Sequence, residues 1–245
     1  KVALKFLGQG HEKLNQTVLG RFEREARVLA SFNHPNIVNI YSIGKYAGIS
    51  YIVMEYVEGA HLGEVIESGA FEVSRATHII GQVLAGLNEA HNKGILHRDI
   101  KPENLLVDVE DRVKIVDFGI CKDMSDESER ITKENLILGT ISYMAPEVVQ
   151  MESPSAASDI FSLGVVFYEL VVGHHPFQGS AAASRMYRIV NEPIRFPRDW
   201  YDKVPSGMPE VIERMTSLNL NYRYKSVTEV MHDLENLSDV VIPSF

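Results

Sequence analysis

The sequence predicts an α+β fold in which a small β-rich part comes first and a larger, mainly helical part follows. Two runs rich in β-branched and aromatic residues, 37–43 and 49–56, are joined by a glycine-containing turn, which is typical of a β-hairpin. After them the chain becomes helical, and the segment 160–172 is apolar on nearly every side, as in a helix buried inside a lobe. The 245 residues, 45% of them hydrophobic, suffice for one large domain or two small lobes.

The earlier elements of the β-rich part read as a strand and a helix. The segment 2–7, which contains Lys5, alternates poorly, as expected of a strand covered on both faces. Residues 20–31 then form an amphipathic helix, which Pro35 stops because the residue before a proline disfavours helical geometry. Glu23 and Glu25 flank the apolar stripe of this helix at similar angles, so periodicity does not choose between them.

The helical part begins with a long amphipathic helix over 74–93, which Gly94 ends. The apolar helix over 160–172 has Asp159 at its N-terminus, where a carboxylate can cap free backbone donors. Later helices are predicted over 181–191 and 209–218. A last helix begins at Ser226, with a capping box that closes on Glu229.

Composition narrows the classes of partner. The formal net charge of −9 argues against nucleic acid or an anionic membrane as the main partner. The single cysteine, Cys121, excludes an internal disulfide and fits a reducing compartment. We therefore expect a cytoplasmic protein, or the cytoplasmic domain of a longer membrane-anchored one. The best apolar run, 165–172, is short and contains Glu169, so we expect no membrane contact from this segment.

The residues that carry chemistry lie around two short β-type runs, 105–107 and 113–116. The stretch His-Arg-Asp-Ile-Lys-Pro-Glu-Asn at 97–104 precedes the first run, and Asp-Phe-Gly at 117–119 follows the second. Two acids and an asparagine thus sit on loops beside strands, where a rigid scaffold can aim them at a ligand. Their oxygen atoms suit a hard divalent cation, and the neighbouring lysine makes the set suitable for phosphoryl transfer.

These two stretches, followed by Ala-Pro-Glu at 145–147, resemble the catalytic domain of the eukaryotic-type Ser/Thr protein kinases. The resemblance covers nearly the whole chain, from the third strand of that fold to its final helix, and looks most like bacterial members. It implies a protein-kinase-like bilobal fold with a partial N-lobe at 1–56. It also implies a C-lobe at 57–245 that contains the catalytic loop and the activation segment.

The resemblance implies ATP and Mg²⁺ as cofactors and transfer of the γ-phosphate to Ser/Thr hydroxyls of protein substrates. Asp99 would accept or orient the hydroxyl proton, and Lys101 would offset charge on the transferred group. Asn104 and Asp117 would hold Mg²⁺. The Lys101 position resembles the Ser/Thr branch, so transfer to tyrosine is not expected.

The resemblance assigns nucleotide-binding roles as well. Lys5 would grip the α- and β-phosphates, paired with Glu25, which the family pattern Arg-Glu-Ala selects. The segment after 49–53 is similar to the kinase hinge. There, Met54 would be the gatekeeper side chain, and the backbone of Glu55 and Val57 would receive adenine. Leu106 is a further nucleotide-binding residue that the resemblance implies.

Structural and regulatory roles follow from the same resemblance. Thr140 would form the floor under the acceptor residue, Glu147 would pair with Arg223, and Asp159 would brace the backbone of the catalytic loop. Phe118 and Gly119 complete the metal-binding segment. Arg98 would hold a phosphate on the activation segment, 117–147, whose middle is acidic and polar. The candidate acceptors are Thr132, which we favour, Ser125 and Ser128.

Two functions from different classes are compatible with these motifs. The glycine-rich hairpin of the family would lie before Lys1, so we expect this chain by itself to be weak or inactive. One alternative is therefore a catalytically impaired kinase-like binding or scaffold module. The intact set of Lys5, Asp99, Asn104 and Asp117 favours an active kinase, because a scaffold has no chemical need for all four. A homodimer that phosphorylates itself in trans is compatible with this reading.

Overall fold

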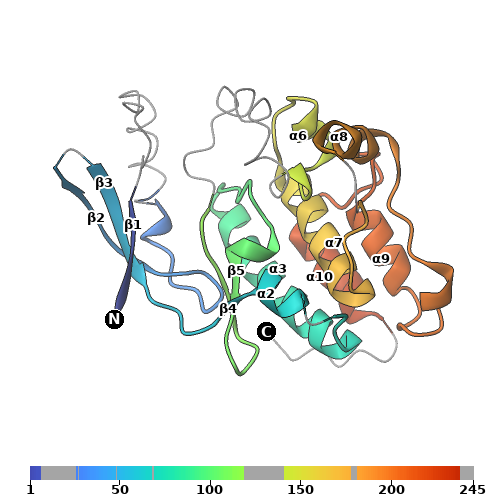
Figure 1. Ribbon diagram of the computed structural model, residues 1–245, viewed down its shortest axis with the longest axis horizontal. Helices are drawn as coiled ribbons and strands as arrows, with labels where there is room; N and C mark the ends of the chain where they lie inside the picture. Colours follow the sequence, from blue (N-terminus) through green and yellow to red (C-terminus); the bar gives the residue numbers. More distant parts are fainter. Residues whose placement is uncertain are drawn as a thin grey trace.

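The computed structural model describes residues 1–6, 26, 28–47, 49–67, 69–118, 141–177 and 181–237. These residues form two lobes, with a small antiparallel sheet at one end of the molecule and a group of helices at the other (Figure 1). The predicted α+β class with a protein-kinase-like arrangement is confirmed. Within the described residues, no helix has the length and apolar content that crossing a bilayer requires.

The small lobe is built on a three-stranded sheet of order β1-β3-β2, in which both pairs are antiparallel. Its strands are β1 (Val2–Phe6), β2 (Ile40–Tyr46) and β3 (Ile49–Glu55). The predicted hairpin is thus present, but its first strand begins at Ile40. Ile37 forms a bridge with Ile115 instead, because it packs into the core of the large lobe and is 1% exposed.

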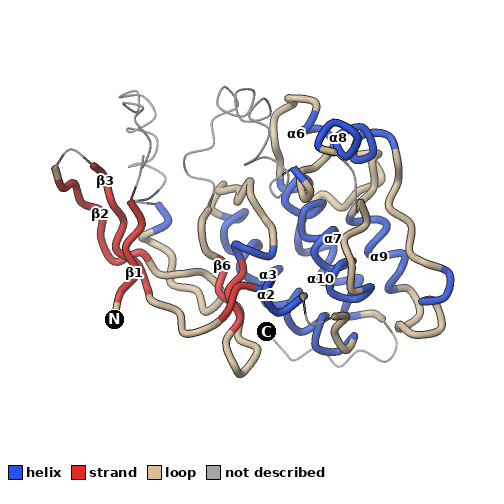
Figure 2. The backbone as a smooth tube through the Cα atoms, in the orientation of Figure 1, coloured by secondary structure: helices blue, strands red, loops and turns tan. Residues whose placement is uncertain are grey.

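A second sheet lies between the small lobe and the helices, and Figure 2 shows its strands apart from those of the first. It has the order β4-β5-β6, again antiparallel. Its strands are β4 (Ala60–His61), β5 (Leu105–Val107) and β6 (Val113–Ile115), and the short 3-10 helix η1 (Pro102–Asn104) precedes β5. The stretch 97–104 therefore leads into β5, and Asp117 follows β6.

The helices of the large lobe are α2 (Leu62–Ile66), α3 (Val73–Asn92), α6 (Pro146–Val149), α7 (Ala156–Val172), α8 (Ala182–Asn191), α9 (Met208–Met215) and α10 (Val227–Glu235), with the 3-10 helix η2 (Arg198–Trp200). Five of them, α3, α7, α8, α9 and α10, agree with the predicted positions to within a few residues, and the short α2, α6 and η2 were not predicted. Gly94 follows α3 with φ 74°, a left-handed conformation that glycine adopts without steric cost. Ser226 caps α10, since its Oγ accepts a hydrogen bond from the Glu229 backbone N–H at 3.3 Å.

The predicted buried helix, α7, is the centre of the large lobe. It packs against α3 on one side and α9 on the other (Figure 1). Apolar residues along its whole length are buried, including Ile160, Phe161 and Phe167 at 0% exposure. The helix begins four residues earlier than predicted, at Ala156 after the N-cap Ser155, because the small residues of its first turn carry no apolar pattern.

Candidate active site

The three polar residues predicted in the catalytic loop lie together. The Asn104 side-chain N–H₂ donates to the Asp99 backbone carbonyl at 2.7 Å and to Asp99 Oδ2 at 3.0 Å. Lys101 Nζ lies 3.4 Å from the same Oδ2. The one-turn helix η1, started by Pro102, brings these residues together, because it reverses the chain between Asp99 and Asn104. The Asp99 carboxylate is thus oriented by an amide and a cation on its own loop.

Asp117 meets a side chain from the other lobe. Lys5 Nζ, on β1, is 2.6 Å from Asp117 Oδ1. The two side chains are 42% and 39% exposed, so solvent screens this pair and a ligand can reach both groups. Asp117 itself has φ 57°, a left-handed conformation that is costly for a residue with a Cβ. Lys5 and Asp117 therefore mark the place where the small lobe faces the catalytic loop.

The backbone on either side of Asp117 is held by the catalytic loop. The Val116 N–H donates to the Asn104 carbonyl at 2.9 Å, and His97 Nε2 donates to the Val116 carbonyl at 3.0 Å. His97 Nδ1 accepts the Asp99 N–H at 3.2 Å, so its ring links Asp99 to the Asp117 segment. The Phe118 ring packs 4.6 Å from the His97 ring, with Phe118 5% exposed. The buried side chains of His97 and Phe118 therefore help to position both Asp99 and Asp117.

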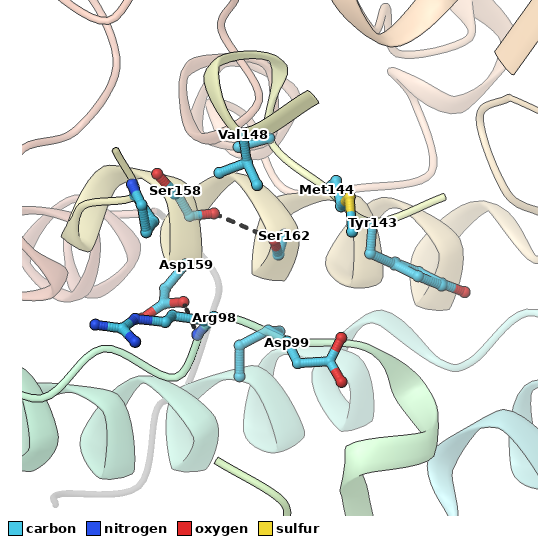
Figure 3. A pocket seen from close by; sticks show the side chains of 11 residues that line it. Arg98, Asp99, Tyr143, Met144, Val148, Ser158, Asp159 and Ser162 are labelled. Atoms are coloured by element: carbon cyan, nitrogen blue, oxygen red, sulfur yellow. Dashed lines mark hydrogen bonds between the residues drawn. The ribbon is translucent and has the colours of Figure 1, made fainter. Parts of the chain in front are cut away.

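Asp159 supports the same loop from α7, and its predicted role as a cap of its own helix is wrong. The N-cap is Ser155, and the Asp159 carboxylate points out of α7 to the catalytic loop (Figure 3). Its Oδ2 accepts the His97 N–H and its Oδ1 accepts the Arg98 N–H, each at 2.8 Å. Arg98 has φ 64°, so these bonds help to hold a strained backbone immediately before Asp99.

A small pocket of about 20 Å³ adjoins this carboxylate and is lined by Arg98, Asp99, Tyr143 and Asp159 among others (Figure 3). The Asp99 carboxylate points away from Asp159 in this view, so the two acids act in different directions. The Asp159 carboxylate faces the loop backbone, and the Asp99 carboxylate is held by Asn104 and Lys101 on its own loop.

The predicted hinge residues lie at the end of β3 and just beyond it. Met54 is partly buried and packs against the small cluster formed by Ala26 and Ile52. The Glu55 N–H donates to the Asn39 carbonyl at 2.9 Å. The Glu55 carboxylate accepts a hydrogen bond from Asn39 Nδ2, also at 2.9 Å. Val57 is partly buried after the strand. Leu106 is partly buried on β5, where it pairs with Lys114 and His61.

The residues Glu147 and Arg223 form a buried ion pair. Arg223 Nη1 and Nη2 donate to the two carboxylate oxygens of Glu147 at 2.8 and 3.1 Å. The side chains are 0% and 5% exposed for Arg223 and Glu147, respectively. Further bonds complete the set, since Arg223 donates to the Ala157 and Ser217 carbonyls and the Ser158 hydroxyl donates to Glu147. The pair ties α6, at the end of the activation segment, to the loop before α10.

Several predicted residues lie outside the described part of the chain. They are Glu23, Glu25, Gly119, Cys121, Ser125, Ser128, Thr132 and Thr140. Of the predicted helix over 20–31, the described residues Ala26, Val28 and Leu29 are helical, and Ala26 and Leu29 are buried at 0% and 3% exposure. The predictions that rest on the other residues stay predictions.

Sequence reasoning missed some residues that contribute to the site. His91 Nε2 donates to Asp159 Oδ2 at 2.8 Å, as a third donor to that carboxylate. A histidine on the apolar face of the predicted helix over 74–93 was the one signal for it.

Tyr143 donates from its hydroxyl to Glu169 Oε2 at 2.6 Å. Burial raises the pKa of the Glu169 carboxyl, while the Tyr143 hydrogen bond opposes that rise. No local pattern marks this pair.

Near this pair, His175 is held in its neutral form. Burial, followed by the charge of Arg185, lowers the pKa of His175 to about 4. The hydrogen bonds also require a neutral ring that is protonated on Nε2 alone. Nε2 donates to the Ser142 carbonyl at 3.1 Å, and Nδ1 accepts the Phe177 N–H at 3.1 Å. A proton on Nδ1 would face that N–H. The turn after α7 therefore depends on an uncharged imidazole.

The donor set of the site fits a magnesium ion that is shared with phosphates. Asp117 supplies a carboxylate, and Asn104, whose N–H₂ is bound to Asp99, retains its amide oxygen as a ligand. Within the described residues, no group of three or more His, Cys, Asp or Glu side chains could hold a metal by themselves. Mg²⁺ typically binds to one or two protein oxygens and completes its shell with phosphate and water.

Comparison with known proteins shows which family this chain resembles. A family model described as "Protein kinase domain" matches residues 1–234. The "Probable serine/threonine-protein kinase PknB" of Lactococcus lactis is 35% identical over 234 residues, which is 95% of this chain and 37% of that protein. The "Serine/threonine-protein kinase PrkC" of Bacillus subtilis is 36% identical over 240 residues, 98% of this chain and 37% of that protein. The "Serine/threonine-protein kinase PknB" of Mycobacterium tuberculosis is 36% identical over 219 residues, 87% of this chain and 35% of that protein. The chain thus spans little more than a third of the length of these relatives.

Proposed function

This chain belongs to the protein kinase domain family, and we propose that it transfers the γ-phosphate of ATP to serine and threonine hydroxyls of proteins. The observation that carries this proposal is the orientation of the Asp99 carboxylate by Asn104 at 3.0 Å and Lys101 at 3.4 Å. Lys101 supports the Ser/Thr branch rather than tyrosine. The names of the relatives, all Ser/Thr kinases, support the same choice.

In the proposed reaction, the substrate hydroxyl oxygen attacks the γ-phosphorus while the bond from that phosphorus to the β,γ-bridging oxygen breaks, which leaves ADP. The Asp99 carboxylate orients the attacking hydroxyl and accepts its proton. Lys101 lies close enough to Asp99 to offset the charge of the transferred group. Asp159 and His97 act through the backbone, because they fix the loop on which Asp99 is carried.

Nucleotide binding would use the groups that meet between the lobes. Lys5 would exchange its contact with Asp117 for the α- and β-phosphates, which frees the Asp117 carboxylate for Mg²⁺ together with the Asn104 amide oxygen. When bound, Mg²⁺ neutralises the charge of the phosphates. Adenine would lie against Met54 and Leu106, with hydrogen bonds to the backbone of the hinge at Val57.

We also propose protein substrates, a cytoplasmic location and regulation by phosphorylation. The net charge of −9 disfavours nucleic acid as the substrate, and the single cysteine fits a reducing compartment such as the cytoplasm. Arg98 adjoins Asp99 and is exposed, so a phosphate at Thr132 in the activation segment would find a cation beside the catalytic acid. Modification of one copy by another would require a transient homodimer.

The test is phosphate transfer by the full-length protein. We expect incubation with radiolabelled ATP, Mg²⁺ and a generic protein substrate to yield phosphoserine or phosphothreonine. Asp99→Asn should lower the rate by about 10²-fold or more, because a positioned base typically contributes 10²–10⁴-fold. The exposed Asp202→Asn is the matched control and should keep the wild-type rate. Binding of ATP without transfer by the wild type would contradict the proposal and favour a kinase-like binding module.

A further inference from the structure

The loop after α7 holds a turn that comes directly after the predicted acceptor floor. Residues 141–144, which we call the acceptor turn, follow Thr140 in the sequence. Ser142 in this turn is 4% exposed, and its backbone carbonyl accepts a hydrogen bond from His175 Nε2 at 3.1 Å. A single side chain from outside the turn thus binds its buried backbone.

The acceptor turn lies beside the catalytic loop. Tyr143 and Met144 line the small pocket next to Asp99, and Figure 3 shows all three side chains around it. Tyr143 also lines a larger, open pocket of about 670 Å³, together with Glu103 of the catalytic loop and His175. A protein segment that brings a hydroxyl to Asp99 would therefore pass along the acceptor turn.

The imidazole of His175 is itself fixed in direction. Its Nδ1 accepts the Phe177 N–H at 3.1 Å, so the ring cannot turn over without losing that bond. The Tyr143 ring meets the imidazole edge-on, with ring centroids 5.1 Å apart and planes at 86°, and the Phe177 ring lies 6.0 Å away. Contacts around the ring therefore aim Nε2 at the Ser142 carbonyl.

Two helices hold the acceptor turn as well. The Tyr143 hydroxyl donates to Glu169 in the last turn of α7, and Arg185 Nη1 on α8 donates to the Ser142 hydroxyl. The helix α7 thus supports the acceptor turn near its end, just as it supports the catalytic loop through Asp159 near its start. One buried helix therefore sets the position of the turn relative to the loop.

Among these contacts, the bond from His175 differs in what it holds. The bonds to Glu169 and from Arg185 end on side chains of the turn, whereas the His175 bond ends on its backbone. Removing a donor from a buried carbonyl costs free energy, so we expect the turn to shift when this donor is lost. The His175 bond is thus the contact to which the course of the acceptor turn should respond most.

We propose that His175 is a positioning residue for the protein substrate, because its Nε2 holds the acceptor turn where a serine or threonine hydroxyl can reach Asp99. The inference rests on the proposed function, since it assumes that Asp99 receives that hydroxyl. Lys5 and Asp117 meet between the lobes, outside the contacts described for His175. Loss of the His175 bond should therefore weaken use of the protein substrate and spare ATP.

The first measurement is steady-state kinetics of the full-length protein, with the best substrate found for the wild type in an arrayed library of serine and threonine peptides. His175→Asn keeps an acceptor for the Phe177 N–H but is too short to reach Ser142. It should raise KM for the peptide about 3- to 10-fold and leave KM for ATP within about twofold. A smaller folded fraction alone would lower kcat and change neither KM.

Two variants serve as matched controls. His175→Gln carries an amide N–H at about the distance of Nε2 from the backbone, so its KM for the peptide should stay within about twofold of the wild type. His232→Asn makes the same change as His175→Asn on α10, where the histidine side chain is 74% exposed, and should leave both KM values unchanged.

The second measurement is amide hydrogen exchange followed by mass spectrometry. His175→Asn should speed exchange of the amides at 142–144 about 3- to 10-fold and leave those of α10 unchanged, because the effect is local. Faster exchange in both places would mean a general loss of stability and would contradict a positioning role. His175→Gln should restore slow exchange in the acceptor turn.

Three kinetic results would overturn the inference. The first is an unchanged KM for the peptide in His175→Asn, and the second is an equal rise in both KM values. The third is a His175→Gln variant as impaired as His175→Asn, since the donor at Nε2 would then be irrelevant. A wild-type protein that phosphorylates no peptide would instead refute the proposed function, and hydrogen exchange would still decide whether His175 holds the turn.

Discussion

Replacing Arg223 by methionine should lower the free energy of unfolding by about 3–5 kcal/mol, because it leaves a buried carboxylate without its counter-ion. Glu147 is 5% exposed and receives two of its charge-assisted hydrogen bonds from Arg223. After the substitution, the Ser158 hydroxyl is the remaining donor among the contacts described above. The carbonyls of Ala157 and Ser217 would also lose the guanidinium.

The same ion pair should respond very differently when both partners are removed. Glu147→Gln alone leaves the guanidinium buried without a carboxylate and should cost several kcal/mol as well. The double variant Glu147→Leu/Arg223→Met leaves no buried charge, so its loss should be clearly smaller than the sum of the two single losses. For a chain of this size, a loss of 3–5 kcal/mol corresponds to a fall in Tm of roughly 6–20 °C.

Urea unfolding at pH 7, followed by circular dichroism, measures these free energies, and calorimetry gives the Tm. The control is Arg195→Met, which breaks an ion pair whose arginine side chain is 72% exposed and which should cost at most about 1 kcal/mol. A loss below about 1 kcal/mol in Arg223→Met would refute the reasoning. Additive losses in the double variant would do the same, since they would mean that the partners stabilise the protein independently.

Further predictions concern catalysis, pH and regulation in the full-length protein. Asp117→Asn should weaken binding of Mg²⁺ with nucleotide and nearly abolish turnover, whereas Asp99→Asn should spare nucleotide affinity and lose transfer; equal loss of affinity in both would contradict the assigned roles. Acidification from pH 7 to pH 5 should cost about 2 kcal/mol through His175, because the unfolded chain takes up this proton near pH 6.5 and the folded protein only near the pKa of about 4. The urea-derived profile of His175→Gln should lack this fall, and a profile parallel to that of the wild type would argue against it. Mass spectrometry after incubation with ATP and Mg²⁺ should find phosphate on Thr132, and Thr132→Ala should be less active; an unmodified Thr132 in fully active enzyme would disprove the assignment and direct attention to Ser125 and Ser128.

The elements that the sequence predicted correctly are those in which a local pattern is sufficient. The hairpin β2–β3 follows from two β-rich runs around a short turn, and α3 and α7 follow from apolar periodicity over long stretches. The Ser226 cap of α10 depends on four consecutive residues. The proximity of Asp99, Lys101 and Asn104 was equally accessible, because a single turn of helix brings them together.

The sequence was less informative wherever a residue's partner comes from another segment. Ile37 is a β-branched residue in a run that predicts a strand of the first sheet, yet it lies outside that sheet and forms a bridge with Ile115 of the large lobe. Asp159 stands where local pattern predicts a helix cap, and only the kinase resemblance predicted that its carboxylate binds the backbone of the catalytic loop, at His97 and Arg98. Ser155 caps α7 in place of Asp159, and Ile37 is drawn into the core of the large lobe, so in both cases a contact outside the local segment decides the position of the residue.

By itself, then, the sequence determined the fold class, the order of the longer elements and the candidate residues for the chemistry, because periodicity and motif spacing are properties of short stretches. The resemblance to the kinase family added the pair of Glu147 with Arg223, which the structure contains. Only the tertiary structure decided that Lys5 contacts Asp117 and that Glu55 binds Asn39 and Lys114, in segments that are distant in the chain. Such pairs depend on how the lobes pack, because a carboxylate gains from a cation only within a few ångströms and after partial removal of water.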